Sequence, residues 1–588
     1  MTGLRKLFWG TLLVGRLLQA QPAADSSHSR VTANHDFLKQ NASWIWQQKF
    51  MGAGQTSSSW LWQFKDQFRS QVFAGFGTEK TWKDENRFSA TLDKVWSPVY
   101  SMGMYARQWI QADRQPSLSN TFANYALGLR SSFKPLPEIT VTPYLGYQNS
   151  RNNKLLEWGW DTGLELKVAD YRLGNYTTRL QGRADYDFYD TRRSFANGAS
   201  VRFFTRFNKL TSDSLSLSWS ESVKQFYSSN GRDLLSVELF NRRIQNHLIY
   251  RLSPVNRLDF ITRINSRHIN YFTSRDIFLI ENLMRYNYLG ADILYMLEFR
   301  TSDETIDNTG LRTDSQSLQS GLSLKAFWDI NERQKLSIDV NYNKLQYDTP
   351  DSLFNHDDRD EIRFAANIRY RYRFSDLLTA EIRLYGYLFR QIYIYREQSI
   401  NNNWNRVIKL QPRIVYKHGP LRNTFSTAVR ADYTAFDFDA LNLRPHSFLF
   451  REYIVSDSLN VLLPGRFNLG MRGRIELEEK GNFFAREFAQ NIIQSYKVTY
   501  WSVFLRKSLW YYFNVQAGYS YFERREWRYF PARRLNRVVE NSGPFVSATY
   551  LYSPRLSWTA YASINRYRDS ARGLSQNTTG YLRFNYTL

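Results

Sequence analysis

Apolar and polar residues alternate strictly along much of this chain. Between Glu361 and Phe374 every even position is apolar or aromatic, whereas the odd positions carry one Glu, one Ala, one Asn and four Arg. Successive side chains of a β-strand point to opposite faces. This stretch therefore predicts a strand with one apolar face and one strongly cationic face.

The same period-two pattern recurs in segments 156–168, 179–188, 336–343 and 467–477. From residue 57 onward such segments follow one another without a convincing helical pattern. Repeated alternation over this length is a strong indication of β-strands. We therefore predict an all-β protein.

The connections between the expected strands alternate in length. Short turns are expected at Ser97-Pro98, Ser253-Pro254 and Ser375-Asp376, and long polar loops at 301–314, 349–360, 438–446 and 523–536. Short turns on one side and long loops on the other are typical of barrels that cross a membrane.

The last residues of the sequence also alternate, with Gly580, Leu582, Phe584, Tyr586 and Leu588 on one face. A strand in this position needs a partner, and closure onto the first strand would supply it. In this respect the chain resembles bacterial outer-membrane β-barrel proteins, whose terminal strand commonly ends in Phe where this chain has Leu. The resemblance concerns architecture, and the sequence contains no motif of a specific family.

The resemblance implies a single large closed antiparallel transmembrane β-barrel over residues 57–588, located in the bacterial outer membrane. Lipid would cover the apolar faces, and a closed sheet would satisfy every backbone hydrogen bond. We expect about 26 strands, with short periplasmic turns and long extracellular loops, or about 24 if region 273–300 holds no strand pair turning near Leu289-Gly290. A soluble propeller or solenoid would show regular Gly and Trp-Asp repeats, which this sequence lacks.

The first 56 residues differ from the rest. Residues 1–20 combine a basic start, an apolar run and a small residue at position 20, as in a secretory signal peptide. We interpret 21–56 as a short periplasmic N-terminal segment ahead of the barrel. Within it, the spacing of Leu38, Ala42 and Ile45 is compatible with one amphipathic helix.

The composition excludes several kinds of chemistry. The chain of 588 residues contains no Cys, which excludes disulfides, thiolate metal sites and covalent c-type haem, and no cofactor is predicted. The net charge of +24 would suit nucleic acid or an anionic surface. Because the arginines are dispersed along a chain with a secretion signal, we expect no nucleic-acid partner. Lipid and lipopolysaccharide of the outer membrane are the expected surroundings.

Arginines recur on the polar face of the expected strands, and we predict that they line the lumen. Two interpretations remain open for them. They could pair with the acidic residues of neighbouring strands, or they could attract anions through their field. The candidate lumen-lining basic residues are Arg363, Arg369, Arg371, Arg373, Arg383, Arg179, Arg183, Arg472 and Arg474.

No catalytic motif accompanies the seven His residues, neither His-Glu-x-x-His nor a nucleophile elbow. We therefore predict that the chain is not an enzyme, although a barrel enzyme assembled from separate strands remains a third possibility. His356, Asp357, Asp358 and Asp360 could bind a cation in an outer loop or simply form a solvated acidic loop.

Two functions remain foremost. The first is a porin-like channel or translocation pore with an Arg-rich lumen. The second is a structural sheath or docking barrel for another envelope protein, such as an electron-transfer or polymer-export partner. A barrel of this size encloses a wide space, and the sequence shows no plug domain. Loops, the segment 21–55 or a partner protein would have to fill the lumen.

Overall fold

The computed structural model describes residues 30–587 apart from 41, 57–58, 75–79, 116–118, 154, 228–232, 311–313, 351–354, 440–445, 485–486, 511, 530–531 and 554. The signal peptide expected at 1–20 lies outside these residues. The strands are β1 (Arg30–Gln40), β2 (Ser43–Gln55), β3 (Trp60–Ala74), β4 (Lys80–Ser97), β5 (Tyr100–Arg114), β6 (Ser119–Leu136), β7 (Ile139–Asn152), β8 (Leu155–Leu173), β9 (Tyr176–Tyr189), β10 (Arg193–Arg206), β11 (Thr211–Tyr227), β12 (Leu234–Arg251), β13 (Asn256–Asn270), β14 (Ser274–Leu289), β15 (Ile293–Thr309), β16 (Ser315–Asn331), β17 (Gln334–Asp348), β18 (Arg359–Arg373), β19 (Leu378–Tyr393), β20 (Asn403–His418), β21 (Leu421–Phe436), β22 (Phe448–Leu463), β23 (Phe467–Phe484), β24 (Ala489–Trp510), β25 (Phe513–Arg528), β26 (Arg534–Ser553), β27 (Leu556–Asp569) and β28 (Gly573–Thr587).

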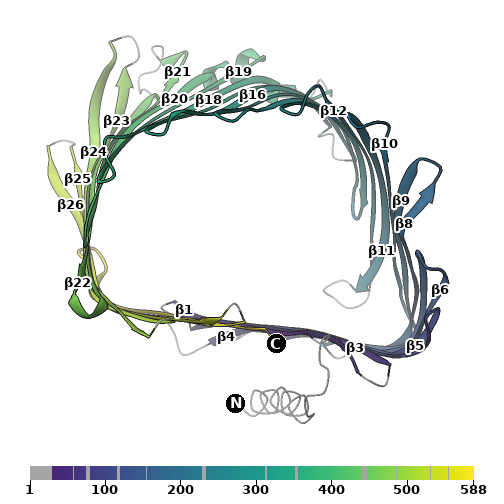
Figure 1. Ribbon diagram of the computed structural model, residues 1–588. Helices are drawn as coiled ribbons and strands as arrows, with labels where there is room; N and C mark the ends of the chain where they lie inside the picture. The colour runs from purple at the N-terminus through teal and green to yellow at the C-terminus, as the bar shows by residue number, and fades with distance from the viewer. Residues whose placement is uncertain are drawn as a thin grey trace.

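All strands belong to one antiparallel sheet of 28 strands, in which each pairs with its neighbours in the chain. The sheet closes because β1 also pairs with β28, from Thr32 opposite Thr587 to Gln40 opposite Thr579. Viewed along its axis, the sheet is one wide ring, flattened along the side of β1–β4 and turning sharply near β5 and β6 (Figure 1). The prediction of an all-β closed barrel is confirmed.

The strand count of 26 was too low. Residues 57–588 do contain the expected strands, β3 to β28, and region 273–300 does hold a strand pair, β14 and β15. The two additional strands are β1 and β2. They lie in the segment that the sequence analysis placed ahead of the barrel.

The interpretation of 21–56 as a separate segment is therefore wrong for residues 30–55, and the helix considered there is not present. The hairpin was hidden because its alternation is incomplete. By register, Leu38 and Ile45 lie on the otherwise polar face, and His35 and Gln48 lie on the apolar one. Pairing with β3 and β28 stabilises this hairpin, and such tertiary pairing outweighs a weak local pattern.

The two ends of the barrel differ as predicted. One end carries only short connections, such as 98–99, 137–138, 174–175 and 419–420, and we call it the short-turn end. The other carries the longer loops, including 349–358, 394–402 and 437–447, and we call it the long-loop end. Short 3₁₀ turns, η1 (Asn355–Asp357), η2 (Arg396–Asn401) and η4 (Pro464–Arg466), are the helical elements of the described residues. None of these is long and apolar enough to cross a membrane.

The outer face of the sheet is apolar. Leu127, Leu129 and Leu145 share this face, and each is more than half exposed. In water this would be costly across an entire sheet, at roughly 25 cal/mol per Å² of exposed apolar surface. Lipid removes that cost, and the closed sheet leaves no edge. The protein is therefore a transmembrane β-barrel of the bacterial outer-membrane type.

The loop between β21 and β22 is braced by Asp439, whose carboxylate accepts the backbone N–H groups of His446 (2.5 Å) and Ser447 (2.9 Å). Burial alone would raise the pKa of Asp439, but these hydrogen bonds outweigh it and hold the pKa below its ordinary value. The carboxylate therefore stabilises the loop above about pH 4, and this contribution is lost as the pH falls through the lowered pKa.

We expect Asp439→Asn to loosen this loop at neutral pH by about 1–2 kcal/mol, because the amide is a weaker acceptor for two N–H groups. Hydrogen exchange of the peptide covering 446–447 should rise several-fold in the variant. The wild type should match the variant only at acidic pH, once rates are corrected for intrinsic exchange. Equal protection at pH 7 would contradict the brace.

Candidate functional site

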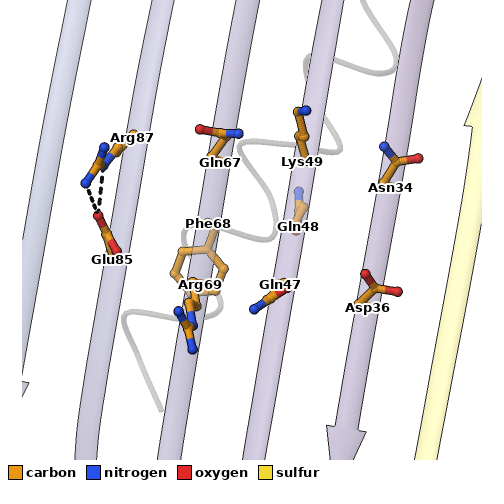
Figure 2. Close-up of a pocket in the computed structure, with 10 residues that line it drawn as sticks. All are labelled: Asn34, Asp36, Gln47, Gln48, Lys49, Gln67, Phe68, Arg69, Glu85 and Arg87. Carbon is orange, nitrogen blue, oxygen red and sulfur yellow. Dashed lines mark hydrogen bonds and ion pairs between the residues drawn. The ribbon is translucent and has the colours of Figure 1, made fainter. Parts of the chain in front are cut away.

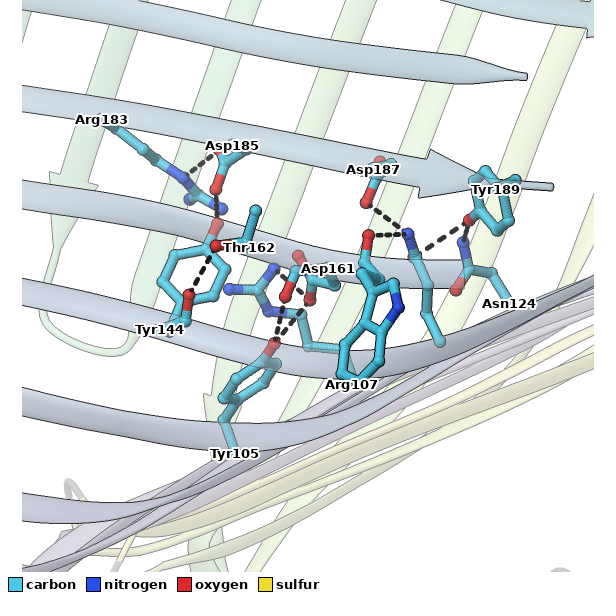
Figure 3. Close-up of polar contacts among 12 residues, drawn as sticks. Tyr105, Arg107, Asn124, Tyr144, Asp161, Thr162, Arg183, Asp185, Asp187 and Tyr189 are labelled. Carbon is cyan, nitrogen blue, oxygen red and sulfur yellow. Dashed lines mark hydrogen bonds and ion pairs between the residues drawn. The ribbon is translucent and has the colours of Figure 1, made fainter. Parts of the chain in front are cut away.

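A tyrosine that spans two strands identifies the concave face of the sheet. Tyr105 on β5 donates its hydroxyl to Asp161 on β8 (Oη to Oδ2, 2.9 Å), although β6 and β7 lie between them (Figure 3). Neighbouring strands are about 4.8 Å apart, so in a flat sheet the two strands would lie about 14 Å apart. The contact requires the sheet to bend toward this face, which is thus the inner face of the barrel.

Glycines on the intervening strands make this bend possible. A Cβ on Gly146 would lie 2.3 Å from the Tyr105 hydroxyl, and one on Gly128 would lie 2.6 Å from the Tyr105 ring. The same arrangement of a tyrosine over a glycine recurs between β7 and β8. Tyr144 of β7 passes over Gly163 of β8, where a Cβ would lie 2.4 Å from its hydroxyl. Small residues at the inner positions let the aromatic rings lie across the sheet.

The Tyr144 hydroxyl donates to Asp185 of β9, so a second hydrogen bond also skips a strand (Figure 3). Around these contacts, Arg107 forms an ion pair with Asp161 (Nη1 to Oδ2, 3.3 Å) and lies over the rings of Tyr105 and Tyr144 at 4.8 Å. The alternation of side chains does not predict this network. Its only sequence signal is the presence of glycines at inner positions of aromatic strands.

The ladder register identifies the inner-face residues of all the remaining strands, because residues paired across a ladder share a face. From Tyr105 the pairs run through Gly128, Gly146 and Asp161, and onward to Arg363 in β18. Continuing through β28 and β1 returns the path to β5 on the same face. All nine basic residues selected from the sequence lie on the face of Tyr105.

Most of these arginines are paired with carboxylates. Arg363 contacts Glu361 (2.6 Å), while Arg369 and Arg371 share Glu381 (3.6 and 3.0 Å). The other ion pairs are Arg373 with Asp376 (4.0 Å), Arg179 with Asp170 (2.7 Å), Arg183 with Asp185 and Arg474 with Glu476.

Arg383 and Arg472 have neutral partners instead. Arg383 donates to Asn367 (2.8 Å), and Arg472 lies over the Phe504 ring at 5.2 Å. Pairing between acids and bases is thus extensive on the inner face. Since most of these arginines are about half exposed, each pair contributes at most about 1 kcal/mol.

The flattened wall holds a polar hollow of about 430 Å³ on β1–β4 (Figure 2). Its inner-face residues are Asn34, Asp36, Gln47, Lys49, Gln67, Arg69, Glu85 and Arg87. Four of them come from the β1–β2 hairpin, for which the sequence pattern predicts a place ahead of the barrel. Within the hollow a single ion pair joins Arg87 and Glu85 (2.7 Å), and Asp36 pairs with Arg583 of β28 outside it (2.7 Å).

Carboxylates that could bind a metal ion occur in one loop and on the wall. Asp358 is buried and accepts the Thr349 N–H (2.6 Å), so it braces its own loop. Among the described residues, only Glu452, Glu476 and Glu478 bring three carboxylates within 4.8 Å of one another. They lie on the inner faces of β22 and β23 beside Arg474.

Comparisons with known proteins are limited to structure. No protein-family model and no curated protein matches the chain. The chain is similar to the FrpB iron transporter from Neisseria meningitidis, with 10% identity, a TM-score of 0.41, and coverage of 97% of this chain and 83% of that one. It is also similar to the siderophore receptor PirA from Pseudomonas aeruginosa, with 8% identity, a TM-score of 0.35, and coverage of 96% and 81%. A third is the copper transporter OprC, with 9% identity, a TM-score of 0.36, and coverage of 97% and 82%.

Proposed function

We propose that the protein is a wide translocation pore of the outer membrane, with an Arg-rich charged lumen wall. The observation that carries this proposal is the closed 28-stranded sheet, whose inner face bears charged and polar residues. A circular barrel of 28 strands would be roughly 50 Å across between backbones, given the usual strand spacing and tilt. In the part of the chain that the structure describes, no element crosses this space.

The width limits how the arginines could act on small ions. The field of a wall charge decays over about 8 Å at physiological salt, so it does not reach the centre of such a lumen. Small ions should therefore pass with weak selectivity. Large anionic solutes that touch the wall would be affected more strongly.

The pore proposal predicts conductance that depends on Arg369, Arg371 and Arg373. Changing all three to Gln should shift the reversal potential toward cations in dilute salt of about 10 mM, where the Debye length is about 30 Å, and leave it unchanged at 1 M. Single-channel recording of the purified barrel in planar bilayers measures this. The neutral double variant Asn341→Gln/Asn343→Gln, on the neighbouring strand, serves as control.

A barrel that does not conduct at all would contradict the pore. Unchanged selectivity of the triple variant in dilute salt would show that these arginines do not face the conducting path.

A second candidate is a docking barrel for another envelope protein. It is favoured by the same width, because an unfilled lumen of this size would admit most solutes without discrimination. Under this candidate the barrel should co-purify with a stoichiometric partner from membranes, and it should conduct only after that partner is removed.

A further inference from the structure

Positive charge is distributed unevenly over the inner face. One concentration lies in the half of β18–β24 nearest the short-turn end, which we call the cationic sector. In β18 and β19 the sector contains Arg369, Arg371, Arg373 and Arg383. Their carboxylate partners are Glu381, which two arginines share, and Asp376 in the turn at a distance of 4.0 Å. Charge is thus only partly compensated on these two strands.

The next strands add cations without acids. Arg413 and Lys417 of β20 and Arg422 of β21 are exposed, and none makes an ion pair with a described carboxylate. Arg413 lies opposite Glu381 in the ladder, but that carboxylate already contacts Arg369 and Arg371. The positive charge that β20 and β21 contribute to the sector is therefore uncompensated, whereas Arg430, farther along β21, pairs with Asp432 (3.0 Å).

On β23 and β24, at the far edge of the sector, most of the arginines also lack a carboxylate partner. Arg472 lies over Phe504, and Arg506 of β24 donates to Gln516 (2.8 Å), so both have neutral partners. Only Arg474 contacts a carboxylate, that of Glu476. The intervening strand β22 contributes neutral polar groups.

The wall at β13–β15 holds more of its arginines in ion pairs. On β13–β15 three inner carboxylates are matched: Asp259 by Arg257 (2.5 Å), Glu281 by Arg263 (3.0 Å) and Arg300 (2.7 Å), and Glu298 by Arg285 (2.7 Å), whereas Glu304 makes no ion pair with a described residue. A barrel that needed only a stiff polar wall could have balanced β18–β24 in the same way. The unmatched side chains instead remain exposed to the lumen.

The dimensions of the sector indicate what kind of anion fits it. Seven adjacent strands span about 30 Å along the wall, in the upper and left part of the ring in Figure 1. Because the field decays within about 8 Å, the sector acts only on something in contact with the wall. A single anionic polymer chain would contact a small part of it and leave most of a lumen roughly 50 Å wide unfilled. The face of a folded domain matches the sector and also occupies the lumen.

We propose that the cationic sector is the seat of a folded acidic protein that enters the lumen from the short-turn end. This inference rests on the docking-barrel candidate and adds the position and chemistry of the contact. Arginine suits such a contact because its planar guanidinium binds carboxylates through two parallel hydrogen bonds.

The absence of Cys from the chain allows a direct test. A benzophenone cross-linker would be attached to a single cysteine introduced at Thr424 or at Ser458, in outer membranes of cells that produce the protein. These two neutral residues are ladder partners within the sector. The controls are single cysteines at Ser216 and Ser220, which lie on the inner face of β11, outside the sector. We expect both sector positions, and neither β11 position, to cross-link one acidic protein.

The proposal requires that cross-linking depend on the positive charge of the sector. Changing Arg413, Lys417 and Arg422 together to Gln should reduce cross-linking at least tenfold. The same charge change at Arg202, Arg206 and Arg243, inner-face residues of β10 and β12, should leave it unchanged.

Several outcomes would overturn the inference. Cross-links to polysaccharide only, or protein cross-links that persist in the sector variant, contradict an electrostatic protein seat. A partner that cross-links from Ser216 and not from the sector would preserve the docking function and refute this position. Cross-linking from neither place would refute both.

Discussion

Replacing Asp161 with Ala is expected to destabilise the barrel by about 3 kcal/mol or more. The side chain of Asp161 is only 4% exposed, accepts the Tyr105 hydroxyl and pairs with Arg107. Its removal leaves the Tyr105 hydroxyl, on a residue that is 3% exposed, and the Arg107 guanidinium without their partner where the sheet bends. An unsatisfied buried donor costs about 1–3 kcal/mol, and a charged group costs more. Urea unfolding of the barrel in lipid vesicles, followed by Trp fluorescence, measures the loss.

The control is Asp329→Ala, which removes the partner of Lys335 in an ion pair whose side chains are both more than half exposed. That change should cost less than about 1 kcal/mol. Coupling between the bend residues is tested with Tyr105→Phe, Asp161→Asn and the double variant. Equal losses for Asp161→Ala and Asp329→Ala, together with additivity in the cycle, would mean that the bend does not depend on this hydrogen bond.

Cysteines introduced at Asn34 and Asn585 are expected to form a disulfide in nearly every molecule. The two residues are direct partners in the ladder that joins β1 to β28. Paired residues of antiparallel strands have Cα atoms about 4.5–5.5 Å apart, within the range that a disulfide requires. Because the chain has no other Cys, a shift in the electrophoretic mobility of the denatured protein reports this bond alone.

The control pair combines Asn34→Cys with Ser547→Cys on β26, which β27 and β28 separate from β1. It should remain reduced under the same oxidant. If the Asn34 and Asn585 pair also remained reduced, the N-terminal hairpin would not be part of the wall. That result would restore the interpretation of 21–56 as a segment outside the barrel.

The alternation of side chains was sufficient to predict the fold class, the β14–β15 pair and the face of every arginine singled out. It predicts these features because a lipid-facing barrel wall tolerates few exceptions on its outer face. The β1–β2 hairpin escaped prediction where exceptions accumulate, with Leu38 and Ile45 inside and His35 outside. In a barrel this wide, a single apolar residue toward the lumen costs little, so the pattern need not be strict there.

The inner network could not be predicted in the same way. Alternation assigns a side chain to a face but not to a distance across strands, and the contact between Tyr105 and Asp161 depends on how sharply the sheet bends. The cationic sector could be predicted in part. Its arginines are visible in the sequence. That Arg413 lacks a carboxylate partner is visible only once the register places it opposite Glu381, which Arg369 and Arg371 already contact.

The ladder between β1 and β28 also bears on how the barrel forms. All the other ladders join strands that follow one another in the chain, so hairpins can form in sequence at a small entropic cost. The seam, by contrast, joins Asp36 to Arg583, which are 547 positions apart. Closing a loop of that length costs about 6 kcal/mol of chain entropy if nothing else is ordered, but much less once the intervening hairpins have assembled. The seam should therefore be the last pairing to form, and the rate of folding should depend on how quickly a curved, open sheet brings its two edges together.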